Sequence, residues 1–225
     1  YLGGRDQLGN VENFDRECGH QTHYGSADDK SDAEPPPPTH QPTRRLLGTR
    51  RRCDGIVRYM KRLMILRHGK SDWNAGAASD HARPLSRRGT GAAMTMGRLL
   101  SRLGEAPDLI VTSSAVRARE TAMLAADAGG WGCETIEVDD LYGTSAAGAL
   151  RVASGTADDV ERLMLVGHQP TWGYLVLALT GAAVEMKTAT VAAVDMRMAS
   201  WRHAPEAAGS LAYLLQPRLF DNWEL

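Results

Sequence analysis

The sequence has little that would direct the chain to a membrane, to nucleic acid or to an oxidising compartment. No apolar run approaches the roughly 18 residues of a membrane-spanning helix. Basic residues (26) and acidic residues (27) nearly cancel, so no overall electrostatic field favours nucleic acid or a membrane surface. The three cysteines are odd in number and scattered, which fits a reducing compartment better than a disulfide framework. No charged-then-apolar signal pattern opens the sequence, and we therefore expect a cytoplasmic protein.

Residues 1–60 also contain few of the aliphatic side chains that form a core. They contain four successive prolines at residues 35–38, many small polar residues and no sustained hydrophobic period. Such a segment cannot bury enough apolar surface to offset the entropy of ordering it, so we predict a disordered N-terminal extension. Its arginines between residues 44 and 58 could bind phosphate-rich partners or belong to a solvated linker. Alternatively, translation starts at Met60 or Met64 and the extension is upstream sequence.

One group of residues in this extension has a spacing that suggests a metal site. Cys18, His20 and His23 lie close together in the sequence. No second pair of ligands follows at the distance typical of a zinc finger, so we expect no metal there.

From residue 61 onwards, strand signals alternate with helix signals. We predict strands at residues 63–66, 108–112, 134–138, 162–166, 191–196 and 211–215, and helices at residues 85–103, 115–128, 146–153 and 170–179. This alternation predicts an α/β fold with a mostly parallel central sheet flanked by helices on both faces. The predicted domain covers residues 61–220 and leaves residues 221–225 as a tail.

Polar residues gather where three of the predicted strands end. Arg67 and His68 follow the first strand, T-S-S and Arg117 follow the second, and His168 follows the fourth. Ligands bind at the carboxyl ends of parallel strands, so these side chains should meet beside two helix N-termini and bind an anion such as phosphate. Gly69 would let the backbone pass close to the bound group. A zinc site formed with His81 is the alternative, but the arginines would repel a cation.

The ordered set of these motifs resembles the histidine phosphatase superfamily, also called the phosphoglycerate mutase-like family. The resemblance covers residues 61–220 and rests on R-H-G after the first strand, S-S-A-V-R-A-R-E-T-A at the second helix and V-G-H-Q-P at the fourth strand. R-H-G-K-S-D-W, D-H-A-R-P-L-S-R-R-G and G-S-L-A-Y-L-L-Q-P-R resemble its short SixA-type branch, the phosphohistidine phosphatases. No long insertion could form a cap, which implies an open site for a phosphorylated protein side chain.

The resemblance implies a role for each motif residue. His68 would be the nucleophile, forming a phosphohistidine intermediate that water hydrolyses. Arg67, Arg117 and a protonated His168 would bind the phosphoryl oxygens and stabilise the charge of the transition state. Asn74 would be a secondary phosphate ligand. The resemblance implies neither a cofactor nor a metal.

The proton donor is where this sequence departs from the family pattern. Relatives that cleave phosphate esters carry a glutamate just before a Tyr-Gly pair, whereas V-D-D-L precedes Tyr142 here. The donor would be Asp139, unless this residue is a solvated loop aspartate without a catalytic role. An imidazole leaving group, whose conjugate acid has a pKa of about 6.5, departs with far less protonation than an alkoxide does. The departure therefore favours phosphoramidate (N–P) substrates.

Three functions remain open from the sequence. The favoured one is a metal-independent phosphatase that acts on phosphohistidine or a similar phosphoprotein target. The second is a general small-molecule phosphomonoesterase or mutase-like enzyme, and the third is a catalytically inactive phospho-binding module. The expected partner is a phosphorylated protein or a small phosphorylated metabolite, and not nucleic acid or a membrane.

Overall fold

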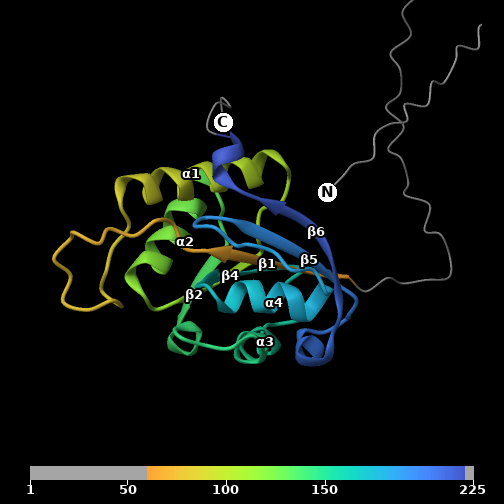
Figure 1. The fold of residues 1–225 in the computed structure, drawn as a ribbon. Helices are drawn as coiled ribbons and strands as arrows, with labels where there is room; N and C mark the ends of the chain where they lie inside the picture. Colours follow the sequence, from red (N-terminus) through yellow and green to blue (C-terminus); the bar gives the residue numbers. More distant parts are fainter. Residues whose placement is uncertain (1–59, 221–225) are drawn as a thin grey trace, which may run out of the picture. The chain divides into compact units, whose positions relative to one another are not determined.

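Strands and helices alternate along residues 60–220, the part of the chain that the computed structural model describes (Figure 1). The elements are β1 (Lys61–Arg67), α1 (Arg87–Arg102), β2 (Leu109–Ser113), α2 (Val116–Gly129), β3 (Glu134–Val138), η1 (Asp139–Leu141), α3 (Ala146–Ser154), β4 (Arg162–Gly167), α4 (Thr171–Thr180), β5 (Val191–Met196), η2 (Trp201–Glu206), β6 (Gly209–Leu215) and η3 (Pro217–Phe220). The predicted extension, except for Met60, and the predicted tail lie outside the described residues, as do Cys18, His20 and His23.

The six strands form one sheet in the order β3-β2-β4-β1-β5-β6. β1, β2, β3 and β4 run parallel to one another, while β5 runs antiparallel to β1 and β6 antiparallel to β5. The predicted α/β fold with a mostly parallel sheet is thus confirmed. Because β1, β2 and β4 are adjacent and parallel, their carboxyl ends lie at one edge of the sheet, where the polar motifs follow them.

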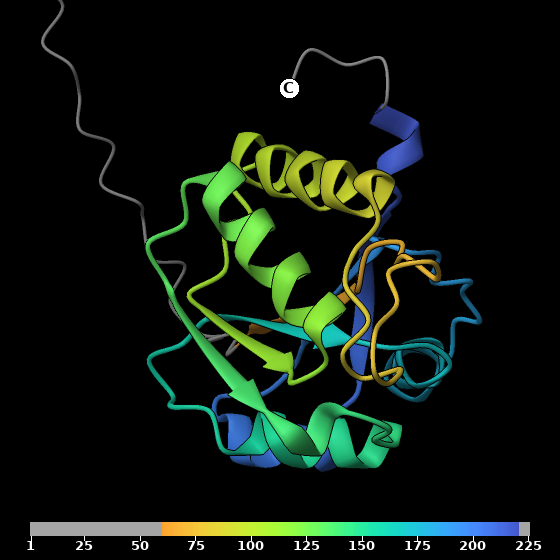
Figure 2. The ribbon, with the colours of Figure 1, turned by 90° about the vertical axis from the view of Figure 1, so that its left-hand side faces the viewer.

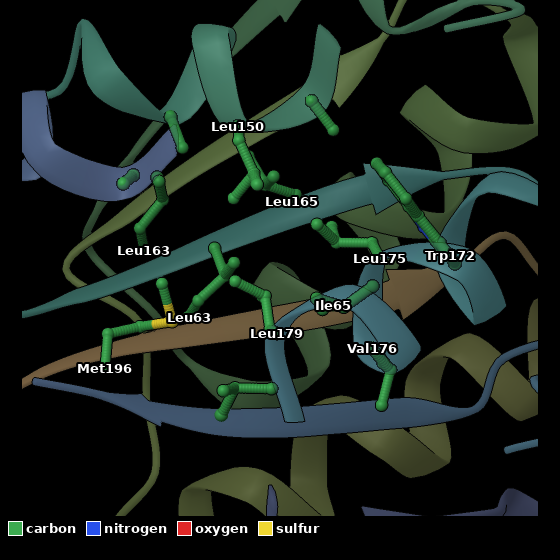
Figure 3. Packing of buried hydrophobic residues seen from close by; sticks show 14 of the residues in the cluster. Leu63, Ile65, Leu150, Leu163, Leu165, Trp172, Leu175, Val176, Leu179 and Met196 are labelled. Atoms are coloured by element: carbon green, nitrogen blue, oxygen red, sulfur yellow. The ribbon is translucent and has the colours of Figure 1, made fainter. Parts of the chain in front are cut away.

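Alternating side chains of the central strands supply two hydrophobic cores, one on each face of the sheet. Leu63 and Ile65 of β1 pack with Leu165 of β4 against α3 and α4 on one face (Figure 3). Met64 and Leu66 pack against α1 and α2 on the other face, and Figure 2 shows these two helices together on their side of the sheet. β1 is therefore buried on both faces, which fixes the position of the residues that follow it.

β1 begins two residues earlier than predicted because its charged residues are paired. Lys61 is buried and its Nζ lies 2.8 Å from a carboxylate oxygen of Glu161. Arg62 pairs with Glu105 at 2.6 Å and with Asp195 at 2.7 Å. Hydrophobicity alone cannot indicate a strand end that is stabilised by ion pairs from other elements.

The helix boundaries follow the predicted signals closely. The hydroxyl of Ser86 accepts a hydrogen bond from Gly89 N and caps α1. α4 ends at Gly181, whose φ of 73° lies in the left-handed region. No helix within residues 60–220 is long and apolar enough to cross a membrane.

The packing of α1 on α2 predicts opposite effects of alanine at two glycines of α1. A Cβ at Gly97 would overlap the backbone carbonyl of Ala125 in α2, whereas a Cβ at Gly91 would meet no atom within 4 Å. Gly97→Ala should lower the free energy of unfolding by roughly 1–3 kcal/mol through overpacking. Gly91→Ala, the matched control, should raise it by roughly 0.5–1 kcal/mol through helix propensity. Urea denaturation measures both, and equal effects would contradict the close approach of the helices.

Candidate active site

The predicted histidines and Arg117 meet at the carboxyl edge of the sheet. His68 follows β1, His168 follows β4, and Arg117 lies in the first turn of α2. The rings of His68 and His168 are 5.0 Å apart between centroids. Arg117 lies between them, with its Nε 3.4 Å from His68 Nε2 and an Nη 3.4 Å from His168 Nδ1. Side chains from three separate elements thus form one cluster.

The surroundings of His68 determine which of its nitrogens is free to react. Nδ1 lies 2.7 Å from the carbonyl oxygen of Gly69, which can only accept, so Nδ1 carries the proton. Nε2 then holds the lone pair and points towards Arg117. Burial, assisted by the nearby His168, Arg117 and Arg67, lowers the pKa of His68 to about 3, although its hydrogen bond to Gly69 opposes this effect. At neutral pH, His68 is therefore an uncharged imidazole whose unprotonated Nε2 accepts a long hydrogen bond from Arg117 Nε.

Gly69 is confined between two helices. A Cβ at this position would lie 2.7 Å from the carbonyl oxygen of Gly89 in α1. The Gly69 N–H donates to the hydroxyl of Thr121 in α2 at 2.9 Å. The close approach that requires glycine is therefore to α1, and it holds in place the carbonyl group that orients His68.

Arg117 is buried, with 5 % of its surface exposed, and Asp80 fixes its orientation. One Nη donates to the backbone carbonyl of Asp80 at 2.6 Å, and the other lies 2.9 Å from the Asp80 carboxylate. The Arg117 backbone carbonyl accepts a hydrogen bond from Thr121 at 2.6 Å. The guanidinium is thus fixed before any ligand arrives.

Arg67 contributes a second positive charge to the same cavity. Its Nη1 donates to the carbonyl of Met186 at 2.7 Å, but its buried Nε has no hydrogen-bond partner among the described residues. Burial lowers its pKa, yet a guanidinium remains charged at neutral pH. An anion bound here would compensate both the buried charge and the unused donor.

His168 is uncharged at neutral pH in the site without a ligand, whereas the sequence-based expectation is a protonated His168 that binds phosphate. Its Nε2 lies 3.0 Å from the hydroxyl of Ser113. Burial, followed by the charge of Arg117, lowers its pKa to about 4. Without a ligand, His168 is therefore neutral at pH 7, because two arginines share the same buried space. The expectation of a protonated His168 concerns the site with phosphate bound and stays a prediction. A bound phosphate dianion would act in the opposite direction and raise this pKa.

The loop between β1 and α1 supplies site residues to which sequence reasoning gave no role. The cavity of about 510 Å³ that holds the histidines and arginines is also lined by Asp80, Arg83 and Trp73. Arg83 pairs with Asp80 at 2.7 Å and lies 3.4 Å from the centre of the Trp73 ring. The D-H-A-R-P-L stretch could have indicated two of these residues, but only through the family resemblance, because the loop has no periodic pattern.

Asp80 is the one carboxylate among the described residues lining this cavity. Partial burial would raise its pKa, but Arg117, Arg83 and a hydrogen bond from the Tyr142 hydroxyl together hold the pKa below its usual value. The carboxyl group is consequently ionised at neutral pH and has no proton to donate to a leaving group.

The structure does not bring Asn74 or Asp139 to the cavity. Asn74 is exposed in a turn where its backbone N–H donates to the Asp72 carboxylate at 2.9 Å. Asp139 is exposed at the start of η1, and Tyr142, three residues later, lines the cavity instead. The family resemblance implied roles for both residues, but the turns after β1 and β3 do not bring them to the lining of this cavity.

The zinc alternative finds no geometric support in the part of the chain described. His81 lies 3.0 Å from the hydroxyl of Ser114 and makes an edge contact with the ring of Tyr142. No group of three histidine, cysteine or acidic side chains within residues 60–220 is arranged to hold a metal ion.

Comparison with known proteins gives consistent matches for this domain. A family model described as the histidine phosphatase superfamily (branch 1) matches residues 63–144. An uncharacterised chloroplastic protein of Arabidopsis thaliana is 30 % identical over 165 residues, which cover 69 % of this chain and 76 % of the relative.

Two solved SixA structures have the same fold. The SixA protein of Nakamurella multipartitia is 26 % identical, with a TM-score of 0.61, over 70 % of this chain and 96 % of the other. The SixA protein of Agrobacterium tumefaciens is 26 % identical, with a TM-score of 0.59, over 70 % of this chain and 98 % of the other.

The lowered pKa of His68 predicts how stability depends on pH. The folded protein keeps His68 neutral down to a pKa of about 3, whereas an unfolded chain protonates histidine at about 6.5. Stability is thus present above pH 6.5 and lost as the pH falls towards 3. Between about pH 6 and 4, the free energy of unfolding should fall by up to about 1.4 kcal/mol more per pH unit than in His68→Asn.

Urea denaturation across this pH range measures the difference in slope. His203→Asn, at an exposed histidine of η2, is the matched control and should keep the slope of the unsubstituted protein. Identical slopes for all three proteins would show that His68 is not held in its neutral form.

Proposed function

This chain belongs to the histidine phosphatase superfamily, in its SixA-like branch, and from that premise we propose that it hydrolyses phosphohistidine, or a similar phosphorylated side chain of a protein, through a phosphohistidine intermediate on His68. The observation that carries the proposal is the neutral, buried imidazole of His68, with its Nε2 lone pair 3.4 Å from Arg117. The SixA proteins of Nakamurella and Agrobacterium are provisionally assigned as phosphohistidine phosphatases, which supports the same substrate class.

In the first step, the Nε2 lone pair of His68 attacks phosphorus. A new N–P bond forms as the N–P bond of the substrate breaks, and the electron pair of that bond stays on the leaving nitrogen. The leaving group departs as neutral imidazole when its other nitrogen carries a proton taken from solvent. This chemistry needs no carboxylic acid in the site.

The two arginines stabilise the charge on the transferring phosphoryl group. Arg117 is already oriented by Asp80 and adjoins the attacking nitrogen. Arg67 offers a buried Nε donor that no atom of residues 60–220 uses. Because both donors are fixed in advance, they can stabilise the transition state without a cost of reorganisation.

In the second step, water attacks the phosphorus of the intermediate and releases inorganic phosphate. The His68 Nδ1 proton, donated to Gly69, keeps the phosphorylated ring in its protonated form. Cleavage of the N–P bond therefore returns His68 directly as a neutral imidazole. The same hydrogen bond that prepares the nucleophile also prepares it as a leaving group.

The carboxyl groups in and near the cavity do not favour the alternative of a small-molecule phosphomonoesterase. An alkyl ester requires a proton donor, but Asp80 is ionised and Asp139 does not line the cavity. We propose N–P bonds as the preferred substrates for this reason. Because two arginines neutralise the phosphoryl group, we also propose that catalysis proceeds without a metal ion.

A substrate panel in the presence of EDTA tests this proposal. A phosphohistidine peptide should be hydrolysed with a higher kcat/KM than p-nitrophenyl phosphate or a phosphoglycerate. Arg117→Ala should lower kcat on the peptide by roughly 10²–10³, as expected for loss of a preorganised donor. Arg119→Ala, which removes an exposed arginine from the same helix, should leave kcat unchanged. A preference for the esters, or a requirement for added Mg²⁺, would contradict the proposal.

A further inference from the structure

A second cavity, of about 560 Å³, adjoins the candidate active site. Lys70 and Thr188 line both cavities, so the two are continuous along the protein surface. Its walls come from the loop after β1, from α1, from the segment before β5 and from η3. Figure 2 shows η3, the short helix after β6, next to α1.

Among residues 60–220, four positive side chains line this cavity and no carboxylate does. They are Lys70, Arg88, Lys187 and Arg218, and we call the cavity the basic pocket. Lys187 has an acidic partner, Glu185, at 3.6 Å, but that residue is exposed and does not line the pocket. The other three side chains make no ion pair with any residue described in the structure.

The basic pocket differs from the phosphate-binding cavity in how its cations are placed. Arg117 is buried and already held by Asp80, whereas Arg88 and Arg218 are exposed and have no partner among the described residues. Buried, fixed arginines match one phosphoryl group with defined geometry, while exposed and separated cations suit several negative groups on one extended ligand.

We propose that the basic pocket binds acidic side chains that flank the phosphorylated residue of the protein substrate. The proposal rests on the proposed function and adds a sequence preference to it. With the phosphoryl group against His68 and Arg117, a continuous segment would pass Lys70 and reach Arg88 and Arg218. Glutamate or aspartate on that segment would supply counter-charges that the described residues do not provide.

The test compares two phosphohistidine peptides that differ only in flanking residues, glutamates in one and glutamines in the other. The enzyme should have a kcat/KM about fivefold higher on the acidic peptide, the size expected for two exposed ion pairs. The difference should lie in KM, and the ratio should approach one at an ionic strength of about 1 M, where the screening length is about 3 Å.

Two double variants identify which arginines cause the preference for the acidic peptide. Arg88→Gln with Arg218→Gln should bring the ratio between the peptides close to one. Arg87→Gln with Arg98→Gln, the matched control, removes two exposed arginines of α1 that do not line the basic pocket, and should keep the full preference. Each ratio is measured within a single enzyme preparation, so a variant that folds less well gives the same answer.

The outcomes separate this proposal from the function on which it rests. If free phosphohistidine is hydrolysed but both peptides react equally, the docking proposal is wrong and the proposed function stands. If no phosphohistidine substrate is hydrolysed, the proposed function fails and this proposal fails with it. Inhibition by a small bisphosphate that depends on Arg88 and Arg218, with no discrimination between the peptides, would assign the basic pocket to a metabolite and overturn the proposal.

Discussion

The hydrogen bond from His68 Nδ1 to the Gly69 carbonyl, 2.7 Å long, sets the protonation pattern on which the chemistry of the site depends. It leaves the lone pair on Nε2, where Arg117 and the cavity are. The carbonyl group is held in turn because Gly69 packs against Gly89 of α1 and donates to Thr121 of α2. Two helices on one face of the sheet therefore fix the tautomer of one imidazole.

The site combines this neutral nucleophile with positive charges whose burial costs free energy. Arg67 and Arg117 are withdrawn from water, and one donor of Arg67 has no partner in the part of the chain that the structure describes. Burying such groups costs free energy unless a counter-charge is present. Asp80 provides part of that charge for Arg117. A phosphoryl group would provide the rest. Binding of the anion would therefore offset the free-energy cost of burying the two arginines.

Much of the fold could be predicted from the sequence because apolar residues recur with a clear period. The same reasoning placed His68, Arg117 and His168 at one sheet edge, since parallel neighbouring strands must end together. This reasoning could not place Arg83 and Asp80 in the site. Their loop has no hydrophobic periodicity, and their positions depend on the ion pairs of Asp80 with Arg83 and with Arg117, which is distant in the sequence. The charge of His168 also could not be predicted, since its pKa depends on burial beside arginines.

We infer that the buried and the exposed cations of the two cavities have different roles. Buried arginines beside His68 would act on the phosphoryl group that every substrate shares. Exposed cations of the basic pocket would distinguish one phosphorylated segment from another through its acidic residues. The first set needs rigid placement by α2 and β1, whereas the second tolerates mobile side chains on α1 and η3.

The central claim is that His68 carries the phosphoryl group during turnover. Rapid quenching without acid, after mixing the enzyme with a ³²P-labelled phosphohistidine peptide, tests it most directly. The account predicts protein-bound label that is acid-labile and alkali-stable, that maps to His68 and that is absent from His68→Ala. Label on a serine or an aspartate, or undiminished turnover by His68→Ala, would contradict it.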